Sequence, residues 1–266
     1  MKSLIFLFLI LCFMTLSSIA QWNVQTVDNN GNSGTLSQIV TDSDGNPHMI
    51  YVKDSKLTYS KWIGASWQSQ IVATSEGGIM DCSMDIDQFD VIYISYTYRN
   101  YNVYGTALYY FSFAKLIPGQ AWSISNLIGS TTLQITDNSI SCYYDQNTSA
   151  VIVHIIYRYN NSLKYRFLDA IGTWHDMDVD ALPNVGAYND MEIDSQGHPH
   201  ISYYDSGGGD LKYAYFNGDI WYCIVIDGLY SNVGSYTSMD IDDNDIVHIS
   251  YYDMDNHQLM HATVSQ

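Results

Sequence analysis

Glutamate is almost missing from this chain of 266 residues: it occurs only at Glu76 and Glu192, and every other acidic residue is aspartate. Aspartate favours turns and glutamate favours helices, so this bias argues for strands joined by tight turns. Basic residues are scarce too, because 10 lysines and arginines stand against 28 acidic residues, a formal net charge of −18. So negative a chain repels phosphate groups, which argues against nucleic acids and anionic membranes as partners.

Long hydrophobic runs are also lacking. The longest apolar run, at 4–14, is too short to cross a membrane, and no segment after it reaches the necessary length. The apolar run at 4–14 follows Lys2 and precedes small residues at 17–20, which together predict a signal peptide over 1–20. We therefore expect a secreted protein whose mature part, 21–266, forms one domain. No feature of the sequence selects an oligomeric state.

Cysteine is too scarce to build the fold. The mature chain keeps Cys82, Cys142 and Cys223, so at most one internal disulfide can form, and Cys82 with Cys142 is the candidate pair. No glycine-rich phosphate loop follows a strand, and no cysteines or histidines have metal-ligand spacing. The sequence therefore predicts no nucleotide, haem or redox cofactor.

One string of six residues, HISYYD, occurs at 200–205 and again at 248–253. Relatives of it begin at three earlier positions, and tryptophans recur in step with them. The five versions begin at His48, Tyr93, His154, His200 and His248, and the tryptophans are Trp22, Trp67, Trp122, Trp174 and Trp221. A period of about 45–60 residues with strand-like patterning is typical of a β-propeller. We predict an all-β, five-bladed β-propeller.

The best-preserved repeat predicts the order of its strands. Segments 190–194, 198–205, 210–216 and 220–227 read as four consecutive strands, a to d, with a innermost. The mature chain starts with a lone d strand at 22–28 and finishes with a, b and c strands. We therefore expect the N-terminal strand to complete the fifth blade and close the ring, which removes exposed sheet edges.

The repeat also carries a family resemblance. The pattern Asp-x-x-Gly-x-Pro-His-Ile-Ser-Tyr-Tyr-Asp at 194–205, followed by Leu-Lys-Tyr-Ala at 211–214, resembles repeats of secreted microbial β-propeller proteins. The strand order around its Asp-x-x-Gly turn is similar to that of NHL-type repeats, and the blade number and repeat length are similar to those of tachylectin-like five-bladed lectins. The resemblance implies an architecture, so function has to be argued from sites.

Residues that recur in every repeat are best explained by structure. We expect the histidines to bond within their own blades and the tryptophans to fill the wedges between blades. The acidic strings at 42–46 and 240–245 fit short hairpin turns better than calcium loops, which leaves at most weak Ca²⁺ binding. The sequons at Asn147 and Asn160 would carry glycans in a eukaryotic secretory pathway.

Two groups of residues vary between repeats and are candidates for function. Asp85, Glu192 and Asp240 lie at one position of three inner strands, where they either line a polar channel or act as the carboxylates of a glycoside-active enzyme. The other group lies in loops that combine flat aromatic rings with aspartates, and this combination is suited to binding a carbohydrate. These loop residues are Tyr188, Tyr204, Asp205, Tyr236, Tyr252 and Asp253.

The leading hypothesis is a non-catalytic, lectin-like protein that binds carbohydrate through these loops on one face. A glycoside hydrolase or related enzyme that uses the channel carboxylates is the first alternative. An extracellular adhesion or matrix protein that binds another protein is the second.

Overall fold

A computed structural model describes residues 23–264, and within them every regular element is a β-strand. The predicted signal peptide, 1–20, lies outside the described residues. Within 23–264 there is no helix with the length and apolar character needed to span a membrane. The described strands form five antiparallel sheets, four with four strands each and the last with three.

The first sheet holds β1 (Ser33–Thr41), β2 (Pro47–Lys53), β3 (Lys56–Trp62) and β4 (Trp67–Thr74). The second holds β5 (Ile79–Ile86), β6 (Ile92–Tyr101), β7 (Ala107–Leu116) and β8 (Ser123–Thr131). The third holds β9 (Ile135–Asp145), β10 (Ala150–Tyr159), β11 (Ser162–Leu168) and β12 (Trp174–Asp180). The fourth holds β13 (Val185–Ile193), β14 (Pro199–Asp205), β15 (Asp210–Phe216) and β16 (Trp221–Asp227). The fifth holds β17 (Val233–Ile241), β18 (Val247–Asp253) and β19 (Gln258–Val264).

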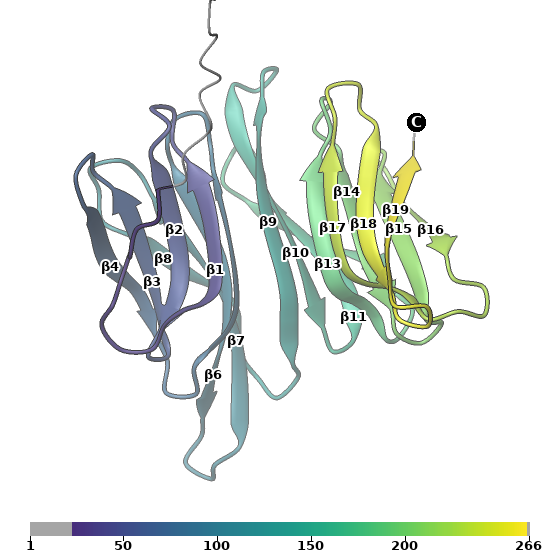
Figure 1. The fold of residues 1–266 in the computed structure, drawn as a ribbon, viewed down its shortest axis with the longest axis horizontal. Helices are drawn as coiled ribbons and strands as arrows, with labels where there is room; N and C mark the ends of the chain where they lie inside the picture. The colour runs from purple at the N-terminus through teal and green to yellow at the C-terminus, as the bar shows by residue number, and fades with distance from the viewer. Residues whose placement is uncertain (1–22, 265–266) are drawn as a thin grey trace, which may run out of the picture.

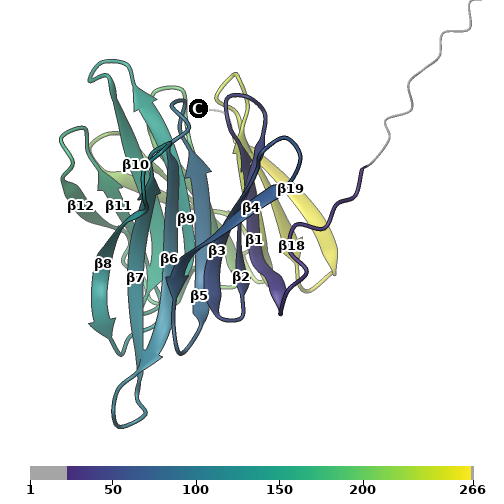
Figure 2. The same cartoon turned by 90° about the vertical axis from the view of Figure 1, so that its left-hand side faces the viewer.

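The order of strands within each sheet confirms the predicted phasing, because neighbours in sequence are neighbours in the sheet. The first strand of each sheet is the innermost one. β1 packs beside β5, β5 beside β9, β9 beside β13, and β13 beside β17. The sheets therefore fan out from an arc of inner strands that runs from β1 to β17 (Figure 1, Figure 2). The fold is all-β and β-propeller-like.

Apolar clusters fill the spaces between neighbouring sheets. In three of these spaces a tryptophan just before or at the start of an outermost strand packs edge-on against an aromatic ring of the preceding sheet. The pairs are Tyr59–Trp122, Phe113–Trp174 and Tyr165–Trp221, with ring centroids 5.3, 5.2 and 5.1 Å apart. The recurrence of one contact confirms that these tryptophans are wedge-filling residues of the repeat.

The histidines of the second strands bond within their own sheets, as expected. His48 contacts the Tyr59 hydroxyl at 2.5 Å and Asp42 at 3.1 Å, and His200 contacts Asp194 at 3.3 Å in the same way. Asp42 also accepts hydrogen bonds from the backbone N–H groups of its turn. These aspartates therefore cap hairpins. Among residues 23–264 no group of three or more His, Cys, Asp or Glu side chains could hold a metal ion.

The expected closing strand is not formed in this structure. Residues 23–28 have no strand conformation, and the sheet of β17, β18 and β19 has no fourth strand among the described residues. A strand gains ladder hydrogen bonds only when it lies alongside its partner. Here the segment is fixed at Asp28, whose carboxylate binds Tyr51 and Lys53 of the first sheet, and it leaves the body of the protein on the N-terminal side of that residue (Figure 2).

Cys82, Cys142 and Cys223 are all free thiols, so the candidate disulfide is absent. The Cys82 and Cys223 thiols instead contact backbone carbonyl oxygens, those of Leu36 and Val179, at 3.2 Å each. Asn147 and Asn160 lie in exposed hairpin turns beside β10, where a glycan would meet solvent. Their glycosylation stays a prediction.

Candidate functional site

Two exposed tyrosines on inner strands have an unusual backbone conformation. The φ angle is +52° at Tyr188 and +55° at Tyr236, in the left-handed region that favours glycine. Each lies in a β-bulge, where the register with the second strand shifts. A bulge re-aims a side chain out of the regular ladder. We predicted both tyrosines on loops, but they belong to β13 and β17, because the bulge interrupts the alternation that marks a strand.

The same bulge occurs in two other sheets, where Leu36 and Asp137 have φ angles of +52° and +49°. Its backbone therefore belongs to the repeat, and what changes between sheets is the side chain that it presents. Glycine would satisfy the backbone at least cost, since a non-glycine residue here is strained by about 1–3 kcal/mol. Tyr188 and Tyr236 are 38% and 67% exposed, so burial of their rings gives little in return.

Four of the predicted residues form a continuous row of rings, which we call the tyrosine row: Tyr204, Tyr188, Tyr236 and Tyr252. Successive ring centroids are 6.2, 4.5 and 6.5 Å apart. The Tyr204 hydroxyl donates to the Asn232 side chain at 2.6 Å, and the Tyr252 hydroxyl lies 2.8 Å from Nδ1 of His257. A hydrogen bond with the Tyr236 hydroxyl raises the pKa of Tyr188. The two outer rings are thus held in place while the two central rings remain accessible.

The two aspartates predicted beside these tyrosines have another role. Asp205 is buried and accepts the N–H groups of Gly207 and Gly208, at 2.8 and 3.0 Å. Asp253 is buried as well and accepts the N–H groups of Asp255 and Asn256. Both carboxylates therefore cap the hairpin turns after β14 and β18, which leaves few acceptor positions for a ligand.

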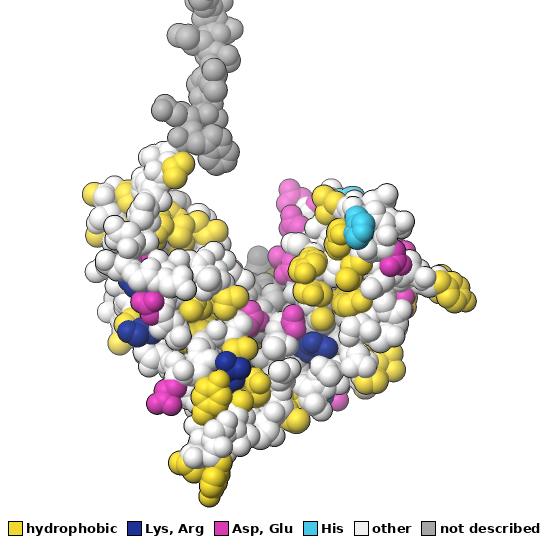
Figure 3. Space-filling view, turned by 60° about the horizontal axis from the view of Figure 1, so that its bottom comes forward, with side chains coloured by type: hydrophobic (Ala, Val, Ile, Leu, Met, Phe, Trp, Pro, Cys, Tyr) yellow, Lys and Arg dark blue, Asp and Glu magenta, His cyan; other side chains and the backbone are white. Residues whose placement is uncertain are grey.

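The tyrosine row lies at the end of the molecule where second and third strands are joined. Figure 3 brings this face forward and shows hydrophobic side chains on both arms of the molecule, with acidic side chains along the hollow between them. An aromatic surface next to acidic groups suits a polar, uncharged ligand better than an anionic one.

The inner-strand carboxylates join neighbouring sheets. Asp85 accepts the backbone N–H of Cys142, on β9, at 2.7 Å, and Asp190 accepts that of Met239, on β17, at 2.9 Å. Innermost strands have one unpaired edge, so a side chain from the next sheet supplies the missing acceptor. Gln38 and Ser83 do the same for the N–H groups of Met84 and Ile140. Sequence reasoning predicted Asp85 as a channel carboxylate but missed this structural role.

Glu192 differs from its neighbours because it makes no side-chain hydrogen bond within residues 23–264. It lines a cavity of about 230 Å³ together with Asp85 and Asp190. Burial and the negative charges of Asp190, Asp240 and Asp85 raise the pKa of Glu192 to about 7. Asp240, the third predicted carboxylate, is exposed and accepts the N–H of the adjacent Ile241. The structure thus brings Asp85 and Glu192 to one cavity and leaves Asp240 outside its lining.

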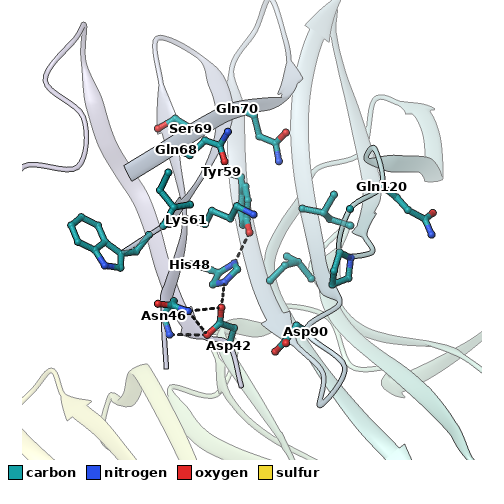
Figure 4. A pocket seen from close by; sticks show the side chains of 16 residues that line it. Asp42, Asn46, His48, Tyr59, Lys61, Gln68, Ser69, Gln70, Asp90 and Gln120 are labelled. Atoms are coloured by element: carbon teal, nitrogen blue, oxygen red, sulfur yellow. Dashed lines mark hydrogen bonds and ion pairs between the residues drawn. The ribbon is translucent and has the colours of Figure 1, made fainter. Parts of the chain in front are cut away.

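A larger cavity, of about 570 Å³, lies between the first and second sheets and was not predicted (Figure 4). Its walls include Lys61 and Gln68, at positions where the third and fourth sheets have aromatic residues. The sequence signal for this cavity is the replacement of aromatic residues by Lys61 and Gln68 in the third and fourth strands of the first repeat. The repeat pattern is clearest in the second strands, which do not carry this signal.

Neither a family model nor a curated protein matches this sequence. Solved structures do share its fold. A protein of unknown function from Dyadobacter fermentans has a TM-score of 0.58 at 11% identity, over 87% of this chain and 78% of that one. The fucose-specific lectin from Aleuria aurantia has a TM-score of 0.52 at 12% identity, over 86% and 73% of the chains.

The intramolecular trans-sialidase from Ruminococcus gnavus has a TM-score of 0.55 at 8% identity, over 82% and 77% of the chains. The common feature is the fold. At such identities the likeness establishes architecture, and function depends on the residues of this chain.

Proposed function

We propose that this is a secreted, non-catalytic carbohydrate-binding protein whose ligand lies on the tyrosine row. The observation that carries the proposal is the display of Tyr188 and Tyr236 side by side, exposed, at bulge positions where glycine would be less strained. Leu36 and Asp137 have the same backbone in other sheets, so the strain belongs to the repeat, and it is the pair of exposed tyrosines at this position that contact with a ligand explains.

The chemistry of the row suits a sugar. A tyrosine ring offers a flat apolar face to the C–H groups of a pyranose, and its hydroxyl exchanges hydrogen bonds with sugar hydroxyls. Asn232 and His257, which hold the outer tyrosines, add polar groups at the two ends of the row. The fold supports the carbohydrate-related part of the proposal, because a fucose-specific lectin and a trans-sialidase have similar folds, whereas the non-catalytic part rests on the residues of the tyrosine row.

The proposal includes a closed, five-bladed ring. Asp28 binds the Tyr51 hydroxyl at 3.0 Å, just as the last residues of β12 and β16, Asp180 and Asp227, bind Tyr203 and Tyr251. The sequence before each aspartate is also alike, because a tryptophan stands six residues earlier in all three cases. Residues 23–28 thus have the anchor of an outermost strand, and β19 has an edge without a partner strand among residues 23–264, where such a strand would pair.

The test is a glycan array probed with residues 21–266. We expect selective binding that Tyr188→Ala and Tyr236→Ala each weaken by about tenfold or more, because each removes one stacking platform. Tyr104→Ala is the matched control, since Tyr104 is 89% exposed and lies in another hairpin. Selective binding that survives both row variants would contradict the proposal. A blank array would favour a protein partner and the adhesion hypothesis.

An enzyme acting on glycosides is the second candidate, and one observation favours it. Glu192, with its pKa raised to about 7 in a polar cavity, can hold a proton at neutral pH as a general acid does. Against this, Asp85 and Asp190 already bind backbone N–H groups. Incubation of the protein with any glycan that it binds, followed by an assay for released reducing ends, separates the two candidates.

A further inference from the structure

The cavity between the first and second sheets lies where the first sheet lacks a stack of rings that the third and fourth sheets have. In the third sheet, Phe167 stacks between His154 and His175, with ring centroids 6.5 and 4.7 Å away. In the fourth sheet, Tyr215 stacks between His200 and Tyr222 in the same register, at 6.1 and 5.0 Å. A stack of three rings thus fills this place in two repeats.

The first sheet keeps the histidine and loses the other two rings. His48 pairs across the strands with Lys61, and Lys61 pairs with Gln68. Two flexible polar side chains therefore stand where two flat rings stand elsewhere, and the space opens into the cavity of about 570 Å³. Local departures from a repeat's own packing rule are expected at functional positions.

Several polar side chains of this cavity have no partner within residues 23–264. Lys61, Gln68 and Gln70 make no side-chain hydrogen bond, ion pair or ring contact with any residue of the described chain, and Figure 4 shows them on one wall of the cavity. Lys115, the equivalent of Lys61 in the second sheet, lies over the ring of Tyr93 at 5.3 Å instead. A half-buried lysine without a partner is notable in a chain with a net charge of −18.

The rest of the lining limits what can bind. Asp42 and Asp90 also line the cavity and keep their negative charges, but neither forms an ion pair with Lys61, and their oxygens accept bonds from Asn46, His48 and Ser43. Trp62, Leu116 and Pro118 supply an apolar surface. Beside these two carboxylates the cavity combines one free cation, three free amide groups, those of Gln68, Gln70 and Gln120, and a nonpolar wall, which matches a compact ligand with one anionic group, several hydroxyls and a C–H face.

We propose that this cavity is a second ligand site, which takes an acidic saccharide such as a uronic acid. The sugar carboxylate pairs with Lys61, its hydroxyls bond to the Gln68 and Gln70 amides, and its C–H face lies against Trp62 and Pro118. The site lies at the other end of the strands from the tyrosine row, between different sheets. It does not depend on the function proposed for that row.

Calorimetric titration at low salt tests the site with three probes: glucuronate, glucose and propionate. We expect glucuronate to bind, and both glucose and propionate to bind at least about tenfold more weakly, because each lacks one half of the recognised chemistry. Lys61→Met should weaken glucuronate binding by about tenfold or more, whereas Lys56→Met, on the same strand, should not change it. Absence of glucuronate binding, binding of glucose or propionate as tight as that of glucuronate, or an unchanged Lys61→Met variant would overturn the proposal.

A second variant separates loss of the site from loss of the fold. Lys61→Tyr combined with Gln68→Tyr rebuilds the stack of the fourth sheet, so we expect a higher melting temperature together with loss of glucuronate binding. The row variants Tyr188→Ala and Tyr236→Ala should bind glucuronate as the native protein does. If the double variant is more stable and still binds glucuronate with native affinity, the ligand does not occupy this cavity.

Discussion

Single residues decide what the repeat displays. The bulge on the inner strand has left-handed backbone at Leu36, Asp137, Tyr188 and Tyr236, so its geometry is common while its side chain is free to vary. The second, third and fourth strands show the same principle. His48, Lys61 and Gln68 leave a polar opening in the register where His200, Tyr215 and Tyr222 form a filled stack. Function is therefore best sought at positions where the frame is constant and the residue is not.

The strain at Tyr236 predicts a trade between stability and binding. Tyr236→Gly should be about 1–2 kcal/mol more stable than Tyr236→Ala, because glycine adopts a positive φ without the clash of a Cβ atom. Both variants should lose carbohydrate binding equally. Urea unfolding of the two variants measures the difference. At Tyr222, an exposed position with ordinary backbone, the order should reverse, since glycine weakens a regular strand.

Strands and turns are the elements that the sequence predicts well. The alternation of β14 and β15 and the glycine-containing turns before them, at 195–197 and 206–209, predicted both strands, with agreement to within a residue. The inner strands are longer than predicted, because their bulges break the period of two. The bonds from Asp85 and Asp190 to the next inner strand were not predictable, since the partner lies in another repeat.

The inner strands also predict a pH effect. The pKa of Glu192 is about 7 in the folded protein and 4.5 in the reference state, so folding becomes less favourable as pH rises between these values. Glu192→Gln removes that cost. It should leave stability unchanged at pH 4.5 and raise it by about 1–3 kcal/mol at pH 8, a range reduced for partial exposure of the side chain.

Urea unfolding at the two pH values checks this expectation. Glu76→Gln is the control, because Glu76 is the other glutamate and is exposed. A uniform gain at both pH values would mean that packing of the glutamine, and not the charge of Glu192, changes stability.

At the scale of the whole molecule, the edge of β19 that faces away from β18 has no partner strand among residues 23–264. By the register of β15 with β16, where Ala214 pairs with Cys223, a closing strand would place Val24 opposite Ala262. We predict that Val24→Cys with Ala262→Cys forms an intramolecular disulfide in a monomer and raises the melting temperature. Mass spectrometry and gel filtration check this outcome.

Val24→Cys with Leu259→Cys is out of register and serves as the control for chance encounters. A disulfide-linked dimer would mean that the segment pairs with a second copy of the chain. If the register pair and the control form equal amounts of disulfide, residues 22–28 have no fixed place on β19.

The sequence by itself determined the strands, their order within each sheet and the number of repeats, because these depend on local alternation, turn residues and period. It also identified the four tyrosines of the tyrosine row, since equivalent positions of adjacent repeats must lie near each other. Only the tertiary structure decided which carboxylates already accept backbone hydrogen bonds: Asp205 and Asp253 do so inside turns, and Asp85 does so between sheets. It alone revealed the cavity beside Lys61, because a cavity depends on what packs across two sheets.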